Sequence, residues 1–269
     1  MAKTGNSGKT ILVERDGPVA TVILNRPEKL NALTKDMWRR LGQVFADLDR
    51  DGDLRCVVLR GAGNKAMGVG ADISEFEDVR ANSKQAAEYG ALVHGSLKAI
   101  RRCRHPVIAL IKGLCVGGAL ELALVCDLRV CGESSRFGVP VNRLGLVMAY
   151  PEIEQLVALV GPAAALEILY EARLFGADEA KDMGLVNRVV ADTLVEAYVA
   201  ETAELIRAGA PLVNRWHKKF VYRVQGGART PEPLSPEEEA EGFACFDTED
   251  FREGWRAFLA KETPAFKGK

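Results

Sequence analysis

PVIALIKGLCVGGALELALVCDLRV, residues 106–130, is the part of the chain whose pattern decides the fold. Val107 to Ile111 form a short apolar run that predicts a buried strand, and the glycine-rich loop KGLCVGG follows it at residues 112–118. The loop opens a second apolar stretch that predicts a helix, and DLRVCGE at 127–133 is again strand-like. Strands that alternate with helices in this way predict a mixed α/β core with parallel strands.

One carboxylate, Glu121, stands inside this apolar segment, shortly after the pair Gly117 and Gly118. An ionised carboxylate in an apolar interior is costly unless it is paired or its pKa is raised. A carboxylate in the first turn of a helix also complements the helix dipole, and that role alone would explain the residue. The neighbours of Glu121 leave no polar helix face, however, so we expect it to be buried, with the raised pKa that suits a general acid or base.

The composition excludes several classes of partner. The chain has 269 residues, is 48% hydrophobic and carries a net charge of −1, so bulk charge gives no reason to expect a nucleic acid. No apolar run reaches the roughly 18 residues of a membrane span, and MAKTGNSGKT at the start lacks the apolar core of a signal peptide. The six cysteines form no CxxC pair, so neither a metal site nor a disulfide framework is expected. These features predict a cytoplasmic protein without a membrane partner.

The rest of the chain divides into an alternating part and a helical part. We expect a core at residues 1–195, with a flexible tail at 1–9, and a helical region at 196–269. In the core the pattern predicts a strand pair around a turn at residues 10–25, a helix capped by Thr34 at 35–50, a strand at 55–60 and a long helix at 83–103. In the helical region it predicts a Gly- and Pro-rich linker at 225–239 and a final amphipathic helix at 246–261.

Two glycine-rich loops each follow an apolar strand. GAGNKAMGVGAD occupies residues 61–72, and KGLCVGG occupies residues 112–118. Where such a loop opens a helix, unpaired backbone N–H groups can stabilise a developing oxyanion. The alternative is that the glycines only permit tight turns and close packing.

The three histidines, His94, His105 and His217, are scattered, and we expect them at the surface or at helix ends.

Four segments in order resemble the signatures of the enoyl-CoA hydratase/isomerase, or crotonase, family: NRPEKLNALT (25–34), KAMGVGADISEF (65–76), residues 106–130 and DTEDFREGWRAFLAK (247–261). The resemblance implies an α/β crotonase-like spiral of repeated ββα units with a C-terminal helical trimerisation region. It also implies an acyl-CoA thioester as substrate, a homotrimer or a dimer of trimers, and no cofactor or metal beyond the coenzyme A of the substrate.

The resemblance also implies roles for individual residues. The backbone N–H groups of Ala71 and Gly118 would hold the thioester oxygen as it becomes an enolate, and Glu121 would be the catalytic carboxylate. Phe258 and Lys261 would close over the coenzyme A of the same or a neighbouring subunit. The substrate and its coenzyme A would be lined by Lys29, Leu30, Ala32, Val69, Asp72, Ile73, Gly117, Pro140 and Val141.

The sequence departs from the family pattern at one important position. Family hydratases use two glutamates, and the second follows a proline, where this chain has Val141 after Pro140. The segment that follows, LVMAYPEIEQL, is also altered, and Glu152 or Glu154 would supply a carboxylate if it folded inward. A positioned acid or base contributes about 10²–10⁴ in rate, so the missing glutamate bears directly on the reaction.

Three functions therefore stay open. The first is hydration of a 2-enoyl-CoA, in which Glu121 activates the water; it is the function that the pattern favours most. The second is a double-bond isomerase, or another enolate reaction that needs only Glu121, and the third is a non-catalytic acyl-CoA binder. The basic segment NRWHKKFVYR (214–223) would suit RNA, but its acidic neighbours favour a solvated helix face.

Overall fold

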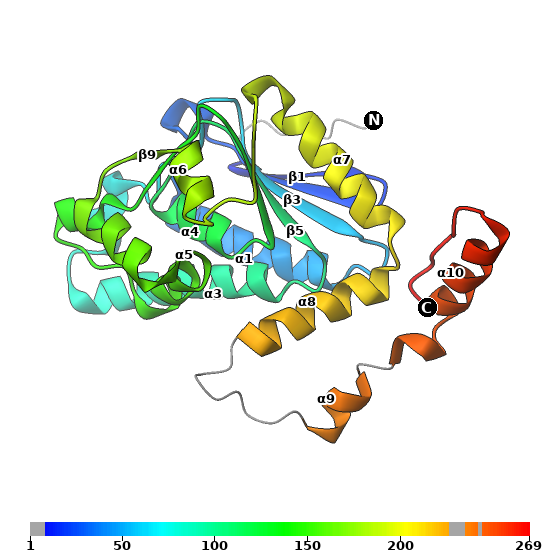
Figure 1. The fold of residues 1–269 in the computed structure, drawn as a ribbon. Helices are drawn as coiled ribbons and strands as arrows, with labels where there is room; N and C mark the ends of the chain where they lie inside the picture. The colour runs from blue at the N-terminus through cyan, green and yellow to red at the C-terminus, as the bar shows by residue number, and fades with distance from the viewer. Residues whose placement is uncertain (1–8, 226–234, 242–243) are drawn as a thin grey trace.

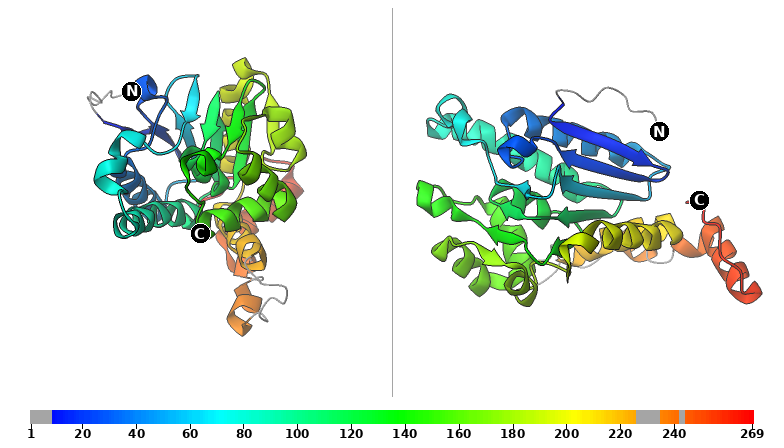
Figure 2. Two further views of the ribbon diagram at one scale, coloured as in Figure 1. Left: turned by 90° about the vertical axis from the view of Figure 1, so that its left-hand side faces the viewer. Right: turned by 90° about the horizontal axis from the view of Figure 1, so that it is seen from above.

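The computed structural model describes residues 9–225, 235–241 and 244–269 (Figure 1). Most of the expected N-terminal tail and of the expected linker lies outside these residues. The described chain contains two sheets, a layer of helices on each face of the larger sheet, and C-terminal helices that project away from the rest (Figure 2).

The larger sheet is parallel apart from one edge. Its order is β1-β2-β3-β5-β7-β10, and only the pair β1 and β2 is antiparallel. These two strands are joined at Gly17, whose φ of 53° suits the predicted turn. The strands are Ile11–Asp16, Val19–Leu24, Cys56–Gly61, Val107–Ile111, Leu128–Gly132 and Arg188–Val190. The predicted α/β core with parallel strands is confirmed.

In a smaller sheet, the strands β4, β6 and β8 lie in the same sequence as β3, β5 and β7, the strands of the larger sheet that they follow in the chain. The smaller sheet has the order β4-β6-β8-β9, with β4, β6 and β8 parallel. Each of these three strands follows a strand of the larger sheet and precedes a helix, which gives the repeated units β3-β4-α3, β5-β6-α4 and β7-β8-α5. The strands are Ala66–Gly68, Leu114–Val116, Arg136–Gly138 and Phe175–Gly176. The expected repetition of ββα units is therefore present.

The helices begin and end close to the predicted positions. Thr34 caps the first helix by accepting a hydrogen bond from the Met37 N–H at 3.2 Å. The α-helices are α1 Lys35–Arg50, α2 Phe76–Val79, α3 Ser83–Arg102, α4 Gly118–Leu124, α5 Tyr150–Glu171, α6 Ala177–Asp182, α7 Val195–Ala208, α8 Pro211–Gln225, α9 Pro236–Glu241 and α10 Glu249–Ala260. The 3-10 helices are η1 Pro27–Lys29, η2 Ile73–Glu75, η3 Pro140–Leu144, η4 Asp192–Leu194 and η5 Ala244–Asp247.

Both faces of the larger sheet are buried. Val57 and Leu59 of β3 point into the core that α1 and α3 cover, whereas Cys56 and Val58 point toward α7. This explains why the central strands read as continuous apolar runs. Val195, with which α7 begins, is fully buried against the sheet, so the boundary placed after residue 195 falls inside a helix that covers the sheet.

Two helices differ from the expectations. α8 has the predicted solvated face only on one side, where His217 and Val221 are exposed. On its other side Lys218 pairs with Asp127 at 2.8 Å, and Tyr222 donates to the same carboxylate at 2.6 Å. Helix α5 is the one described helix whose length and apolar composition would suit a membrane span. Its backbone is interrupted at Gly161 (φ 75°, ψ 167°), ahead of Pro162.

Candidate active site

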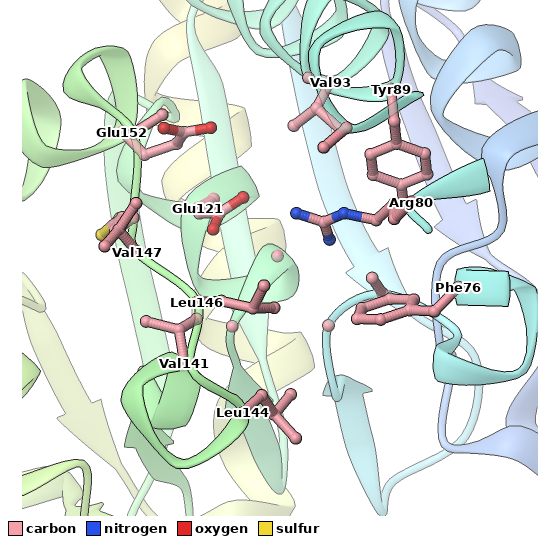
Figure 3. Close-up of a pocket in the computed structure, with 18 of the residues that line it drawn as sticks. Phe76, Arg80, Tyr89, Val93, Glu121, Val141, Leu144, Leu146, Val147 and Glu152 are labelled. Atoms are coloured by element: carbon pink, nitrogen blue, oxygen red, sulfur yellow. The ribbon is translucent and has the colours of Figure 1, made fainter. Parts of the chain in front are cut away.

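A cavity of about 560 Å³ lies between α3, α4, the segment 69–80 and the segment that joins η3 to α5 (Figure 3). Its walls are mainly apolar. The polar side chains that line it are few, and three of them, Arg80, Glu121 and Glu152, come from three different elements. A largely apolar cavity with a few convergent polar groups is the usual form of a small-molecule site.

The two glycine-rich loops meet at the floor of this cavity. Gly70 has φ 91° and Gly117 has φ 54° with ψ −127°, conformations that a residue with a side chain rarely adopts. A β-carbon at Gly70 would lie 3.3 Å from the Gly118 nitrogen, and one at Gly118 would lie 3.0 Å from Trp38 Cζ2. The glycines therefore allow the two loops to approach each other closely. Both an oxyanion site and simple close packing, the two interpretations of these loops, require this approach.

Two backbone N–H groups at this contact have no acceptor. Gly70 O and Leu33 O accept from Leu33 and Asp72, and these bonds hold the first loop in place around Ala71. Within the described ranges, neither the N–H of Ala71 nor that of Gly118 donates a hydrogen bond to the protein. Both residues line the cavity. Two free donors at one place are what an oxyanion requires.

Glu121 lies in the first turns of α4, with its carboxylate toward the cavity (Figure 3). Its neighbours Leu120 and Leu122 are fully buried, so the cavity is the only place for a polar group on this helix. Burial in apolar surroundings, and secondly the negative charge of Glu152, raise the pKa of Glu121 from 4.5 to about 8, although Arg80 opposes the shift. The predicted raised pKa of Glu121 is thus found, whereas its side chain is half-buried because it faces the cavity.

A second carboxylate, Glu152, faces the same cavity from the first turn of α5 (Figure 3). It is 6% exposed, and one of its oxygens, Oε1, is 2.7 Å from His94 Nε2. The other oxygen, Oε2, is buried and has no hydrogen-bond partner in the described chain. A buried carboxylate oxygen without a donor is costly, which suggests that a ligand or water supplies one. Glu154, the other candidate, is exposed.

Arg80 enters the cavity from the opposite wall (Figure 3). Its guanidinium lies 4.9 Å from the centroid of the Phe76 ring and 4.8 Å from that of Tyr89. Both rings line the cavity as well. The aromatic contacts stabilise the cation and fix its direction.

Several residues expected at the site do line the cavity. Val141 lines the cavity from η3, and Figure 3 shows it on the same wall as Leu144 and Leu146. The position at which the resemblance leads one to expect the second glutamate thus faces the cavity with an apolar side chain. The other expected residues that line it are Val69, Ile73, Gly117 and Pro140.

Other expected residues lie outside the cavity lining. Asp72 pairs with Arg26 at 2.9 Å and accepts from Ser74, and the Ser74 and Arg26 bonds lower its pKa. Asp72 therefore holds its loop together and does not face the cavity. Lys29, Leu30 and Ala32 lie in and after η1, where Leu30 has φ 50°.

Phe258 and Lys261 also lie away from the cavity. They belong to the end of α10, which Figure 1 shows beyond α8, and Phe258 is 82% exposed. Within one chain they do not reach the cavity, so their expected role over coenzyme A stays a prediction for a neighbouring subunit.

The histidine expectation is wrong at two of three positions. His217 is exposed, as expected, but His94 lines the cavity and contacts Glu152. His105 is fully buried, its ring nitrogens have no partner among the described residues, and burial lowers its pKa to about 4. The covering element is α8, whose Lys218 donates to the His105 carbonyl at 3.0 Å. That contact joins residues far apart in the sequence, so no local pattern predicts it.

Neither the His94 pair nor Arg80 was predicted from the sequence, and Glu152 was only one of two candidates. A signal for Glu152 exists, because it shares one buried helical face with Gln155 and Leu156. Arg80 stands in a polar segment whose composition is typical of a protein surface.

No group of three or more His, Cys, Asp or Glu that could hold a metal ion is found in the described part of the chain.

Comparison with known proteins agrees with this geometry. The family model described as enoyl-CoA hydratase/isomerase matches residues 14–269. The short-chain-enoyl-CoA hydratase of Clostridium acetobutylicum is 33% identical over 252 residues, 93% of this chain and 95% of that protein. The peroxisomal Delta(3,5)-Delta(2,4)-dienoyl-CoA isomerase of Arabidopsis thaliana is 32% identical over 82% of this chain and 84% of that protein.

Solved structures agree as well. The crystal structure of an enoyl-CoA hydratase/carnithine racemase from Magnetospirillum magneticum has a TM-score of 0.94 and 49% sequence identity, and the match covers 98% of this chain and 97% of that one. The expected crotonase-like fold is thereby confirmed. With the matched family model, these likenesses show that the chain belongs to the enoyl-CoA hydratase/isomerase family.

Proposed function

We propose that the protein adds water to the double bond of a 2-enoyl-CoA thioester, with Glu121 and Glu152 as the two carboxylates. The observation that carries the proposal is that both face one apolar cavity and that Glu152 Oε2 is buried without a hydrogen-bond donor. Glu152 would do from α5 what the residue at Val141 does in family hydratases.

The thioester carbonyl oxygen would accept hydrogen bonds from the free N–H groups of Ala71 and Gly118. When water adds to Cβ, the electron pair of the double bond moves toward this oxygen and an enolate forms. Donors aimed at such a charge are worth about 10²–10³ in rate each. The two loops hold these donors before the substrate arrives, so no reorganisation is needed during the reaction.

The two carboxylates would divide the proton transfers between them. Glu121, with a pKa of about 8, is mostly protonated at neutral pH and can give its proton to Cα. Glu152 Oε2 accepts the proton that water loses as its oxygen bonds to Cβ. The product is a 3-hydroxyacyl-CoA, and one proton returns from Glu152 to Glu121 before the next turnover.

Coenzyme A enters as part of the substrate, and the reaction needs no further cofactor. The residues of η1 and the loop after it, together with Phe258 and Lys261 of a neighbouring subunit, are proposed to hold it. This arrangement requires an oligomer, which we propose is a trimer or a dimer of trimers.

A second candidate is double-bond isomerisation, in which Glu121 alone moves a proton between two carbons. Val141 favours it, because the position of the usual second glutamate is apolar, and one relative is named a dienoyl-CoA isomerase. The third function, binding without catalysis, does not explain why the only carboxylate of α4 has a pKa of about 8.

The experiment is to give the purified protein crotonyl-CoA and, separately, 3-butenoyl-CoA, and to identify the products by chromatography and mass spectrometry. We expect 3-hydroxybutyryl-CoA from crotonyl-CoA at a rate well above any isomerisation. Crotonyl-CoA formed from 3-butenoyl-CoA without any hydration would favour the isomerase. No turnover of either thioester, or of longer ones, would contradict both reactions.

A further inference from the structure

Arg80 is the cationic group of the cavity that the proposed reaction does not use. It caps α2, its backbone N–H donates to the Phe76 carbonyl oxygen at 2.8 Å, and its guanidinium is held between the rings of Phe76 and Tyr89. Figure 3 shows the guanidinium pointing from this wall across the cavity toward Glu121. Its position is therefore fixed by packing, and its donors face the space that an acyl group would occupy.

Apart from these two rings, the guanidinium has no partner among the described residues. Among the residues with described positions, no oxygen accepts a hydrogen bond from it and no carboxylate forms an ion pair with it. Glu121 lies near enough for the charge of Arg80 to act on it, but the two do not form an ion pair. The N–H donors of the guanidinium thus have no acceptor in the described part of the chain, and the group faces a mainly apolar cavity.

The other charged groups of the cavity leave this positive charge uncompensated. Glu152 Oε1 is 2.7 Å from His94 Nε2, so this oxygen already has a hydrogen-bond partner. Glu121 is mainly neutral at pH 7, because burial raises its pKa. A guanidinium that faces a mainly apolar cavity is stabilised when an anionic group accepts its hydrogen bonds. The geometry therefore calls for an anionic ligand group opposite Arg80.

We propose that Arg80 binds a carboxylate at the far end of the acyl group, so that the preferred substrates are thioesters of short dicarboxylic acids. The inference rests on the proposed function, because it takes the cavity to hold an acyl-CoA. A planar guanidinium offers two parallel donors that match a carboxylate. The rings of Phe76 and Tyr89 hold its plane, and the apolar walls at Val93, Val141 and Leu146 suit the methylene chain between the two ends.

Arg80 has one competing role, which is to keep part of Glu121 ionised. That role would act on every substrate alike, because it depends on Glu121 and not on the acyl end. Carboxylate recognition instead changes the ratio between two ligands that differ only in the terminal group. The ratio is therefore the quantity to measure.

The test compares binding of unreactive saturated thioesters by isothermal titration calorimetry. Succinyl-, glutaryl- and adipyl-CoA are each paired with the neutral thioester of equal chain length: butyryl-, pentanoyl- and hexanoyl-CoA. In the wild type we expect at least one carboxylated ligand to bind about 10- to 100-fold more tightly than its neutral partner, as a charged hydrogen-bonded pair permits. The pair with the largest ratio gives the chain length.

Variants then assign the preference to Arg80. Arg80→Met should bring the ratio close to one, and Arg80→Lys, which keeps the charge without the planar fork, should give an intermediate ratio. Arg102→Met makes the same change at an exposed arginine at the end of α3 and should keep the wild-type ratio.

Two results would overturn the inference: equal affinities within every pair for the wild type, or a preference that survives Arg80→Met. Neither depends on catalysis, so the inference and the proposed function fail separately. Hydration of crotonyl-CoA without any carboxylate preference would remove the role of Arg80 alone. Absence of turnover with an intact preference would remove the hydratase alone.

Discussion

Glu152→Gln distinguishes the catalytic role of Glu152 from that of Glu121, because it changes one oxygen atom of Glu152 and little else. The glutamine keeps an oxygen to accept from His94 Nε2, whose present distance to Oε1 is 2.7 Å. It replaces Oε2, the buried oxygen without a donor, with an NH₂ group that cannot accept a proton. The fold and the cavity should therefore survive, while the base that receives the proton of water is lost.

The expected loss follows from this single change. One positioned general base contributes about 10²–10⁴ in rate, so kcat for crotonyl-CoA hydration should fall by about that factor, with a smaller effect on KM. The charge of Glu152 is also the second cause that raises the pKa of Glu121. The variant should therefore move the pKa of Glu121 below about 8, and with it one limb of the pH–rate profile.

The assay follows the loss of ultraviolet absorbance of the conjugated thioester at a series of pH values. Glu154→Gln is the matched control, because Glu154 lies in the same turn of α5 but is exposed. It should keep the wild-type rate. A Glu152→Gln enzyme with half or more of the wild-type kcat, or an equal loss in Glu154→Gln, would refute the reasoning.

Three further predictions concern the loops, the pH dependence and α8. Gly118→Ala places a β-carbon 3.0 Å from Trp38 Cζ2 and should lower kcat by about 10²-fold through its displaced N–H; a wild-type kcat would contradict this. The raised pKa of Glu121 contributes stability to the folded protein that is complete below about pH 4.5 and is lost as the pH rises through about 8. Tm should therefore fall more over this pH range in the wild type than in Glu121→Gln. Parallel curves of Tm against pH would disprove this contribution. Lys218→Met removes the 2.8 Å partner of Asp127, which keeps its hydrogen bonds from Tyr222 and the Val107 N–H, and should lower the free energy of unfolding in urea by about 1.5 kcal/mol. An unchanged midpoint would count against that pair.

Much of the fold was predictable, because it depends on local patterns. The strand pair around Gly17, the Thr34 cap and the apolar runs of β3 and β5 are all visible in short windows of sequence. Each of these elements is determined by its own backbone preferences or by which of its faces is buried. The raised pKa of Glu121 was predictable for the same reason, because its helix has no other polar face.

The rest of the site depends on contacts between distant segments. His94 and Glu152 are 58 residues apart, and their contact forms only because α3 and the start of α5 border one cavity. His105 is buried by α8, which follows it by about a hundred residues. Arg80 follows the short helix α2, in a polar segment whose composition is that of an ordinary surface. Periodicity reports which face of an element is buried, but not which other element covers it.

The measurement that tests the central claim most directly is the hydration of crotonyl-CoA by the wild type and by Glu121→Gln. The account predicts that kcat/KM falls by at least about 10²-fold in the variant, because the proton donor to Cα is removed while the two N–H donors at Ala71 and Gly118 remain. Circular dichroism should show the same fold for both proteins. An equal kcat/KM in the two proteins would contradict the account.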